Sequence, residues 1–165
     1  MSYIAYKVTE VYLLNIITYN HLLGSRAINQ NILQQLTTSL EETPIQIAKG
    51  CASNLRKTIG RLIQLQGWSG KVKIDRSKEI TITSMKNNIG LCIQTGNVGR
   101  FYADILKLQS LYLNEKIEAG IYILPTKYSA NIMGDNLVNF ERFVEELDLY
   151  KKIITVPLFV IGIEN

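Results

Sequence analysis

The chain has few of the residues that build metal centres and disulfide frameworks. Its 165 residues include one histidine, His21, and two cysteines, Cys51 and Cys92, without a Cys-x-x-Cys pair. A zinc site is therefore not expected. Both cysteines lie in apolar surroundings, which favours two buried free thiols in a reducing compartment over a disulfide. His21 has no Ser or Cys partner in a triad pattern, so we expect a structural role for it.

Long apolar runs are also missing. No stretch approaches the roughly 20 residues that a membrane-spanning helix needs, and the first seven residues lack the basic start and cleavage site of a secretory signal. We therefore expect a cytoplasmic protein that does not enter a membrane. With 47% hydrophobic and 19% charged residues, the chain has the composition of a globule. Its length suits one domain over residues 1–165.

Two signatures of phosphate-binding loops are incomplete. Residues 67–71 have a Gly-rich stretch before Lys71, but they lack the spacing of a P-loop and its final Ser or Thr. They also precede a predicted strand where a P-loop requires a helix. Residues 97–99 give no dinucleotide fingerprint. These two classes of nucleotide site are therefore not predicted.

Charges of the two signs are distributed unevenly, with a net charge of +4 and a pI of about 9.0. Cations gather in the middle of the chain, and carboxylates gather near its end. The cations are Arg56, Lys57, Arg61, Lys71, Lys73, Arg76, Lys78 and Lys86, and the carboxylates are Glu141, Glu145, Glu146 and Asp148. The basic half could follow a phosphate backbone, and an ordinary solvated surface explains the same charges.

The predicted fold centres on a strand–helix–strand unit. Residues 89–94 and 119–124 are short apolar runs typical of buried strands. Residues 98–109 between them have apolar residues at helical spacing, and we expect Asn97 to cap that helix. This connection favours two parallel, adjacent and central strands. Gln94 then lies at the carboxyl end of the first strand, where open α/β sheets place their sites.

The rest of the pattern surrounds this unit with further strands and helices. Residues 3–18 favour a long strand or hairpin arm, and Asn29 is expected to cap a helix that ends before Pro44. The other expected elements are helices from Pro44 to near Gly67 and over 136–150, and strands over 72–75, 79–84 and 156–163. Alternation in the strand over 79–84 places Ile80 and Ile82 on one face and Glu79, Thr81 and Thr83 on the other. The order predicts an α/β fold in which helices flank a mixed sheet containing a three-strand meander.

Several short segments occur in the order found in one nuclease family. The segments are residues 19–24, 73–75, 79–83, 92–94, 100–104 and 120–127. In this order they resemble the PD-(D/E)XK nucleases, and most closely the BglII/BstYI restriction endonucleases. The resemblance implies a restriction-endonuclease-like fold, recognition of double-stranded DNA as a homodimer, and Mg²⁺-dependent cleavage in a restriction-modification system.

The chain departs from this family at the catalytic carboxylates. The family has Asp on the middle strand and Glu-x-Gln on the third strand; here Cys92 stands at the Glu position, and Thr81 or Thr83 stands at the Asp position. A thiol and a hydroxyl are poor ligands for Mg²⁺. Glu79 and Asp75 are our predicted substitute ligands. Glu41, Glu42 and Asp104 are further acids that could move into the site, and for each of these acids, Glu79 and Asp75 included, a surface charge is the favoured interpretation.

The resemblance and the strand pattern together define an expected site. Its catalytic positions are Gln94, Glu79, Asp75, Cys92, Thr83 and Thr81, with Glu79 and Asp75 as ligands of Mg²⁺ if the site is active. The expected DNA contacts are Lys71, Lys73, Arg76, Lys86 and Arg100. The alternatives are an inactive nuclease-like fold that binds DNA or protein, and a scaffold subunit of a defence system. Candidate residues for a dimer interface are Leu106, Leu111, Tyr112 and Leu113, which could instead pack on the chain's own sheet.

Overall fold

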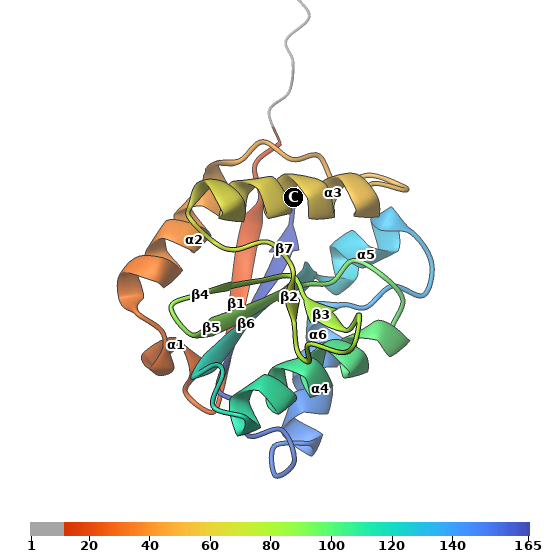
Figure 1. The fold of residues 1–165 in the computed structure, drawn as a ribbon. Helices are drawn as coiled ribbons and strands as arrows, with labels where there is room; N and C mark the ends of the chain where they lie inside the picture. Colours follow the sequence, from red (N-terminus) through yellow and green to blue (C-terminus); the bar gives the residue numbers. More distant parts are fainter. Residues whose placement is uncertain (1–11) are drawn as a thin grey trace, which may run out of the picture.

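A five-stranded mixed sheet forms the centre of the protein (Figure 1). The computed structural model describes residues 12–165, so part of the strand expected over 3–18 lies outside the described residues. The strands in spatial order are β1 (Asn15–His21), β7 (Leu158–Glu164), β6 (Ala119–Pro125), β5 (Ile89–Ile93) and β4 (Ser84–Lys86). The inner pairs β5–β6 and β6–β7 are parallel, and the edge strands β1 and β4 are antiparallel to their neighbours. This confirms the predicted mixed sheet and the buried parallel pair over 89–94 and 119–124.

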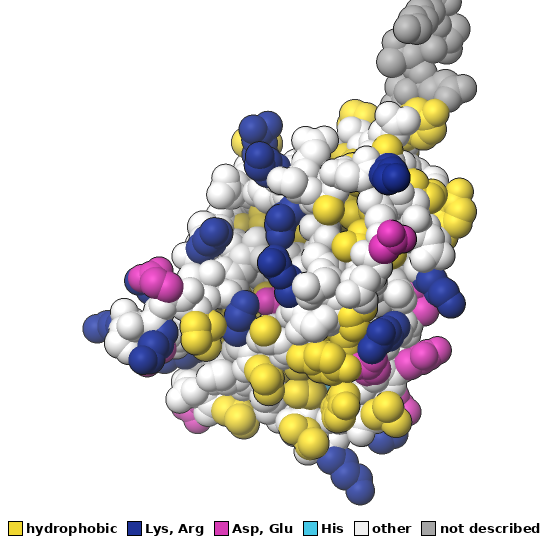
Figure 2. Space-filling model, turned by 90° about the vertical axis from the view of Figure 1, so that its right-hand side faces the viewer, with side chains coloured by type: hydrophobic (Ala, Val, Ile, Leu, Met, Phe, Trp, Pro, Cys, Tyr) yellow, Lys and Arg dark blue, Asp and Glu magenta, His cyan; other side chains and the backbone are white. Residues whose placement is uncertain are grey.

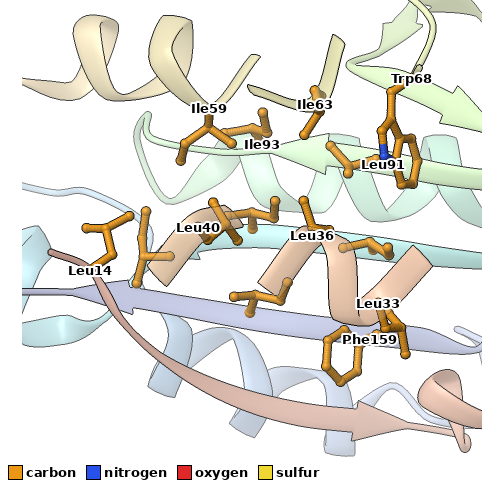
Figure 3. Packing of buried hydrophobic residues seen from close by; sticks show 14 of the residues in the cluster. Leu14, Leu33, Leu36, Leu40, Ile59, Ile63, Trp68, Leu91, Ile93 and Phe159 are labelled. Carbon is orange, nitrogen blue, oxygen red and sulfur yellow. The ribbon is translucent and has the colours of Figure 1, made fainter. Parts of the chain in front are cut away.

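Helices cover both faces of the sheet. On one face lie α2 (Gln30–Glu42) and α3 (Ala52–Leu65), whose apolar side chains point toward the strands (Figure 3). On the other face lie α4 (Gly99–Leu113) and α6 (Phe140–Leu149). The short helices α1 (Gly24–Ala27) and α5 (Lys127–Met133) follow β1 and β6. Successive residues of β5 alternate between the two cores, with Leu91 and Ile93 facing α2 and α3 and Cys92 facing α4.

Two glycines allow α4 to pack close to the sheet. Gly90 of β5 and Gly120 of β6 are register partners, and Leu108 of α4 lies over both. A Cβ on Gly90 would lie 2.9 Å from Cδ2 of Leu108, and a Cβ on Gly120 would lie 3.3 Å from Cδ1 of the same side chain. A larger residue at Gly90 would therefore press on α4, whereas one at Gly120 would first meet Leu158 of β7, at 2.6 Å.

The predicted three-strand meander is wrong in one respect. The segment expected as one strand over 79–84 is divided: β3 (Thr81–Ile82) pairs with β2 (Val72–Lys73) in a separate two-stranded sheet, while β4 pairs with β5. Thr83 stands at the division, where its hydroxyl oxygen accepts a hydrogen bond from Ile93 N at 3.1 Å. Ile82 is buried as predicted, but Ile80 is 44% exposed because it precedes this change of partner.

Two predicted helix starts also differ from the structure. The helix expected from Pro44 begins at Ala52, because the backbone amides before it bond elsewhere: Ile45 N donates to Tyr12 O, and Ile47 N donates to Asn165 Oδ1. The helix expected over 136–150 begins at Phe140, where the side chain of Asn139 accepts from Arg142 N at 3.1 Å.

The predicted caps have different outcomes. Asn29 caps α2 through a bond from Asn31 N at 2.8 Å, as expected. Asn97 does not cap α4 through its side chain; Val98 is the N-cap, and Asn97 contributes its carbonyl oxygen to Arg100 N.

The histidine and one cysteine are structural, as expected. His21 is buried at the end of β1, with Nε2 at 2.8 Å from Ile154 O. Cys92 is a buried free thiol, whereas Cys51 is free but only half-buried, so the prediction of two buried thiols holds for Cys92 alone. Across residues 12–165, none of the helices is both long enough and apolar enough to span a bilayer.

Candidate functional site

A cleft of about 890 Å³ opens at the edge of the sheet, between α3 and α4. The end of β5 and the β2–β3 pair form its floor and side. The lining residues are Arg56, Lys57, Gly60, Arg61, Gln64, Lys71, Thr81, Ile82, Thr83, Ile93, Gln94, Arg100, Ala103, Asp104 and Lys107. Because β4 is short, the end of β5 is open to the cleft rather than covered by a neighbouring strand.

The cleft is strongly basic. Six cations line it, against one carboxylate among the described residues, that of Asp104. The cations are Arg56, Lys57, Arg61, Lys71, Arg100 and Lys107. Lys and Arg side chains run down the left and centre of the face shown in Figure 2, and hydrophobic side chains gather below them. This surface suits an extended anion.

Gln94 is held in a fixed orientation at the end of β5. Its backbone amide continues the sheet by donating to Ile123 O at 2.9 Å. Its side-chain Oε1 accepts from Gly96 N at 2.9 Å, and its Nε2 donates to Oδ2 of Asp104 at 2.5 Å. The side chain is buried, so both halves of its amide have partners where water is scarce. The amide therefore binds Asp104 rather than facing the open cleft as a free ligand.

Asp104 is the centre of a small polar cluster, the Asp104 cluster, made of Gln94, Asp104, Lys107 and Tyr122. Besides the bond from Gln94, Oδ2 of Asp104 accepts from the Tyr122 hydroxyl at 3.3 Å, and Oδ1 is 2.8 Å from Nζ of Lys107. Burial raises the pKa of Tyr122 well above its ordinary value, and the charge of Asp104 raises it further. The phenol therefore stays protonated and donates to the carboxylate. Three donors on one buried carboxylate fix its position.

The three residues that the sequence predicts in place of the family's acids, Thr81, Thr83 and Cys92, differ in their access to the cleft. Thr81 and Thr83 are half-buried and line it beside Gln94. Cys92 faces α4 and is not among the lining residues. Burial raises the pKa of the Cys92 thiol, and the nearby charge of Asp104 raises it further. Cys92 is therefore a neutral packing group behind the cleft.

The structure places Asp75 and Glu79 away from Gln94, on the exposed β2–β3 hairpin, and neither lines the cleft. Asp75 accepts from the hydroxyl and backbone amide of Ser77, and these bonds lower the pKa of its carboxyl. Glu79 pairs with Lys73 across the hairpin. Within residues 12–165, no group of three or more His, Cys, Asp and Glu side chains could hold a metal ion.

The expected DNA contacts are divided in the same way. Lys71 and Arg100 line the cleft, whereas Lys73, Arg76 and Lys86 do not. Lys86 instead donates to the carbonyl oxygen of Gln66 at 2.5 Å.

Sequence reasoning named Lys57 and Arg61 only within the basic half of the chain, and it did not predict that they, Gln64 or Lys107 line the site. Lys57, Arg61 and Gln64 follow helical spacing on α3 and share the face that meets the cleft. Lys107 stands three residues after Asp104 on α4, a spacing that signals a pair on one helix face. The sequence shows Lys57 and Arg61 as part of a basic helix, and it shows Asp104 and Lys107 as an acid–base pair. Neither showed which helix face would meet the end of β5.

Comparison with known proteins identifies this architecture. A family model described as restriction endonuclease BglII/BglIII matches residues 16–163. The crystal structure of restriction endonuclease BglII complexed with a DNA 16-mer matches with a TM-score of 0.82 at 10% identity, over 92% of this chain and 78% of that chain. Free BglII matches with a TM-score of 0.73 at 12% identity, over 92% and 80% of the two chains. No curated protein matches the sequence. The chain therefore belongs to the BglII/BglIII restriction endonuclease family.

Proposed function

We propose that this protein is a cytoplasmic protein that binds double-stranded DNA along the cleft between α3 and α4. The observation that carries the proposal is the charge of the cleft, where six cations face one carboxylate that is already paired with Lys107. Membership of the family supports DNA as the anion. BglII, whose fold this chain shares, has been crystallised with a DNA 16-mer.

The residues of the cleft do not fit the Mg²⁺ site of a nuclease. Magnesium prefers several hard oxygen ligands, commonly carboxylates. Asp104 is the one described carboxylate in the cleft, and both of its oxygens accept bonds from protein donors. Thr81, Thr83 and the neutral thiol of Cys92 add no charge. We therefore propose DNA binding without Mg²⁺-dependent cleavage as the function of this chain.

A second part of the proposal is a homodimer, in which each copy meets one half-site of a duplex. Two of the four candidate interface residues are buried in their own subunit or half-buried, namely Leu111 and Tyr112. Leu106 and Leu113 of α4 are 61% and 66% exposed. Exposed leucines on one helix are the kind of surface that a symmetric interface covers.

The test is a binding titration with a labelled mixed-sequence duplex, followed by fluorescence anisotropy at several salt concentrations. We expect affinity to fall steeply as salt rises, because cations in the cleft displace counterions from the phosphates. Arg61→Ala should weaken binding, and Lys151→Ala should not, because Lys151 lies outside the cleft and pairs with Asp148.

The same samples test cleavage. The duplex is incubated with the protein in Mg²⁺, in Mn²⁺ and in EDTA, and the products are separated on a denaturing gel. Intact DNA in all three agrees with the proposal, whereas cleavage that EDTA abolishes would contradict the loss of hydrolysis. Failure to bind DNA at any salt concentration would move the assignment to a scaffold subunit.

A further inference from the structure

Lys107 is a fixed cation on the wall of the cleft. Its Nζ is 2.8 Å from Oδ1 of Asp104, and its side chain is 22% exposed. An ammonium group has three N–H donors, and the structure assigns one of them to Asp104. Among the described residues Asp104 is the one hydrogen-bond partner of this ammonium, and Lys107 lines the cleft. A phosphate oxygen in the cleft could accept from the other two donors.

The partner of Lys107 cannot easily turn away. Asp104 is buried, and its Oδ2 is held by Gln94 from β5 and by Tyr122 from β6. The carboxylate is therefore anchored to two strands while its Oδ1 anchors the ammonium. A lysine held in this way loses less conformational entropy on binding an anion than a free surface lysine does.

We propose that the Lys107 ammonium binds a DNA phosphate at the place in the cleft where a divalent cation would otherwise be needed, so that DNA binding is independent of Mg²⁺. This inference rests on the proposed function. It follows from a difference between the metal site that the family implies and the cleft of this chain. Asp104, the one described carboxylate in the cleft, is already paired with the Lys107 ammonium.

An ordinary helix pair explains the contact between Asp104 and Lys107 without any role in binding. Residues three apart on a helix often pair and contribute only a few tenths of a kcal/mol at the surface. The exposure of these side chains, 22% for Lys107 and 11% for Asp104, is lower than that of the surface pair Lys151–Asp148, at 57% and 65%. The two explanations differ in what removal of Lys107 does to DNA binding.

The experiment measures affinity for the same labelled duplex in EDTA and in Mg²⁺ at matched ionic strength. The wild-type protein should bind as tightly in EDTA as in Mg²⁺. Lys107→Met should lose about tenfold in affinity in EDTA, since a charge-assisted hydrogen bond is lost. Mg²⁺ should restore part of that affinity, because Oδ1 of Asp104 is then free to attract the ion. The double variant Lys107→Met with Asp104→Asn should bind weakly in both buffers.

Lys116→Met is the matched control, because Lys116 is exposed just beyond α4 and does not line the cleft. It should bind as the wild type does. Thermal unfolding of each variant verifies its fold, and Lys107→Arg, which keeps the charge, should retain binding in EDTA.

Two outcomes would overturn the role of Lys107, and a third would overturn the proposed function. Wild-type binding that requires Mg²⁺ would overturn the role of Lys107 and leave the DNA-binding proposal intact. Wild-type affinity in a folded Lys107→Met variant would overturn it as well. Absence of wild-type binding in both buffers would instead overturn the proposed function.

Discussion

The side-chain amide of Gln94 donates to Oδ2 of Asp104 at 2.5 Å, and this bond joins the end of β5 to α4. Gln94, which the sequence predicts at the catalytic centre, thus holds a carboxylate from the neighbouring helix. Asp104 in turn neutralises Lys107. These polar residues therefore fix α4 to the end of β5, in addition to lining the cleft.

Asp104→Asn should destabilise the protein by about 2–3 kcal/mol, because it leaves Lys107 without its counter-charge in a partly buried position. The measurement is the free energy of unfolding in urea. Asp148→Asn is the control, since Asp148 pairs with Lys151 at the surface and such pairs contribute little. Equal stability losses in the two variants would show that the Asp104 cluster contributes no more stability than an exposed ion pair.

The Cys92 thiol should react slowly with a thiol reagent in the native protein. It is buried, and burial keeps its pKa raised and the thiol protonated, whereas the reactive form is the thiolate. Cys51 is half-buried and serves as an internal reference. Labelling followed by mass spectrometry should modify Cys51 first, and Cys92 only after denaturant is added. Comparable rates for the two thiols would contradict the burial of Cys92.

Stability should fall in alkaline solution. Below pH 9.0, the ordinary pKa of a thiol, Cys92 is protonated in both the folded and the unfolded chain. Its ionisation therefore takes nothing from the free energy of unfolding there. Above that pH the unfolded thiol ionises and the folded one does not, which lowers the unfolding free energy by up to about 1.4 kcal/mol per pH unit. Urea titrations at pH 8, 9 and 10 should show this loss in the wild type and a smaller one in Cys92→Ala. An identical slope in both would assign the effect to other groups, such as Tyr122.

Two glycines should respond in opposite directions to alanine. A Cβ on Gly60 of α3 would meet nothing within 4 Å, so Gly60→Ala should stabilise the helix by about 0.5–1 kcal/mol. A Cβ on Gly90 would lie 2.9 Å from Leu108 and 3.1 Å from Ile117, so Gly90→Ala should destabilise the protein by about 1–3 kcal/mol. Melting temperatures check both. A lower melting temperature for Gly60→Ala would contradict the free space that the structure shows around Gly60.

Replacing Leu106 and Leu113 together by lysine should convert the proposed dimer to a monomer without unfolding it, because both side chains are exposed in one subunit. Light scattering at micromolar concentration gives the mass. Leu65→Lys is the control, since Leu65 is 90% exposed on α3 and is not part of the proposed interface. A wild-type protein that is monomeric both alone and with DNA would exclude this mode of recognition.

The strand–helix–strand unit could be predicted because two short apolar runs flank a segment with clear helical spacing. The division between β3 and β4 could not, since it depends on a bond between Thr83 and the distant Ile93 N. The same limit applies to the acids of the site. Strand alternation directed attention to Glu79 and Asp75, but the carboxylate beside Gln94 comes from a helix, and its orientation is set by packing rather than by local pattern.

The packing of Leu108 over Gly90 and Gly120 means that the cleft also depends on residues that do not line it. Leu108 directly follows Lys107, so a change in how closely α4 packs on the sheet would also move the Lys107 side chain, which lines the cleft. A methyl group added to Gly90 would lie 2.9 Å from Leu108 and would press on the helix at that residue. The proposed binding of DNA would then weaken in a chain whose cleft residues are all unchanged. A comparison of the cleft residues alone would not reveal that loss.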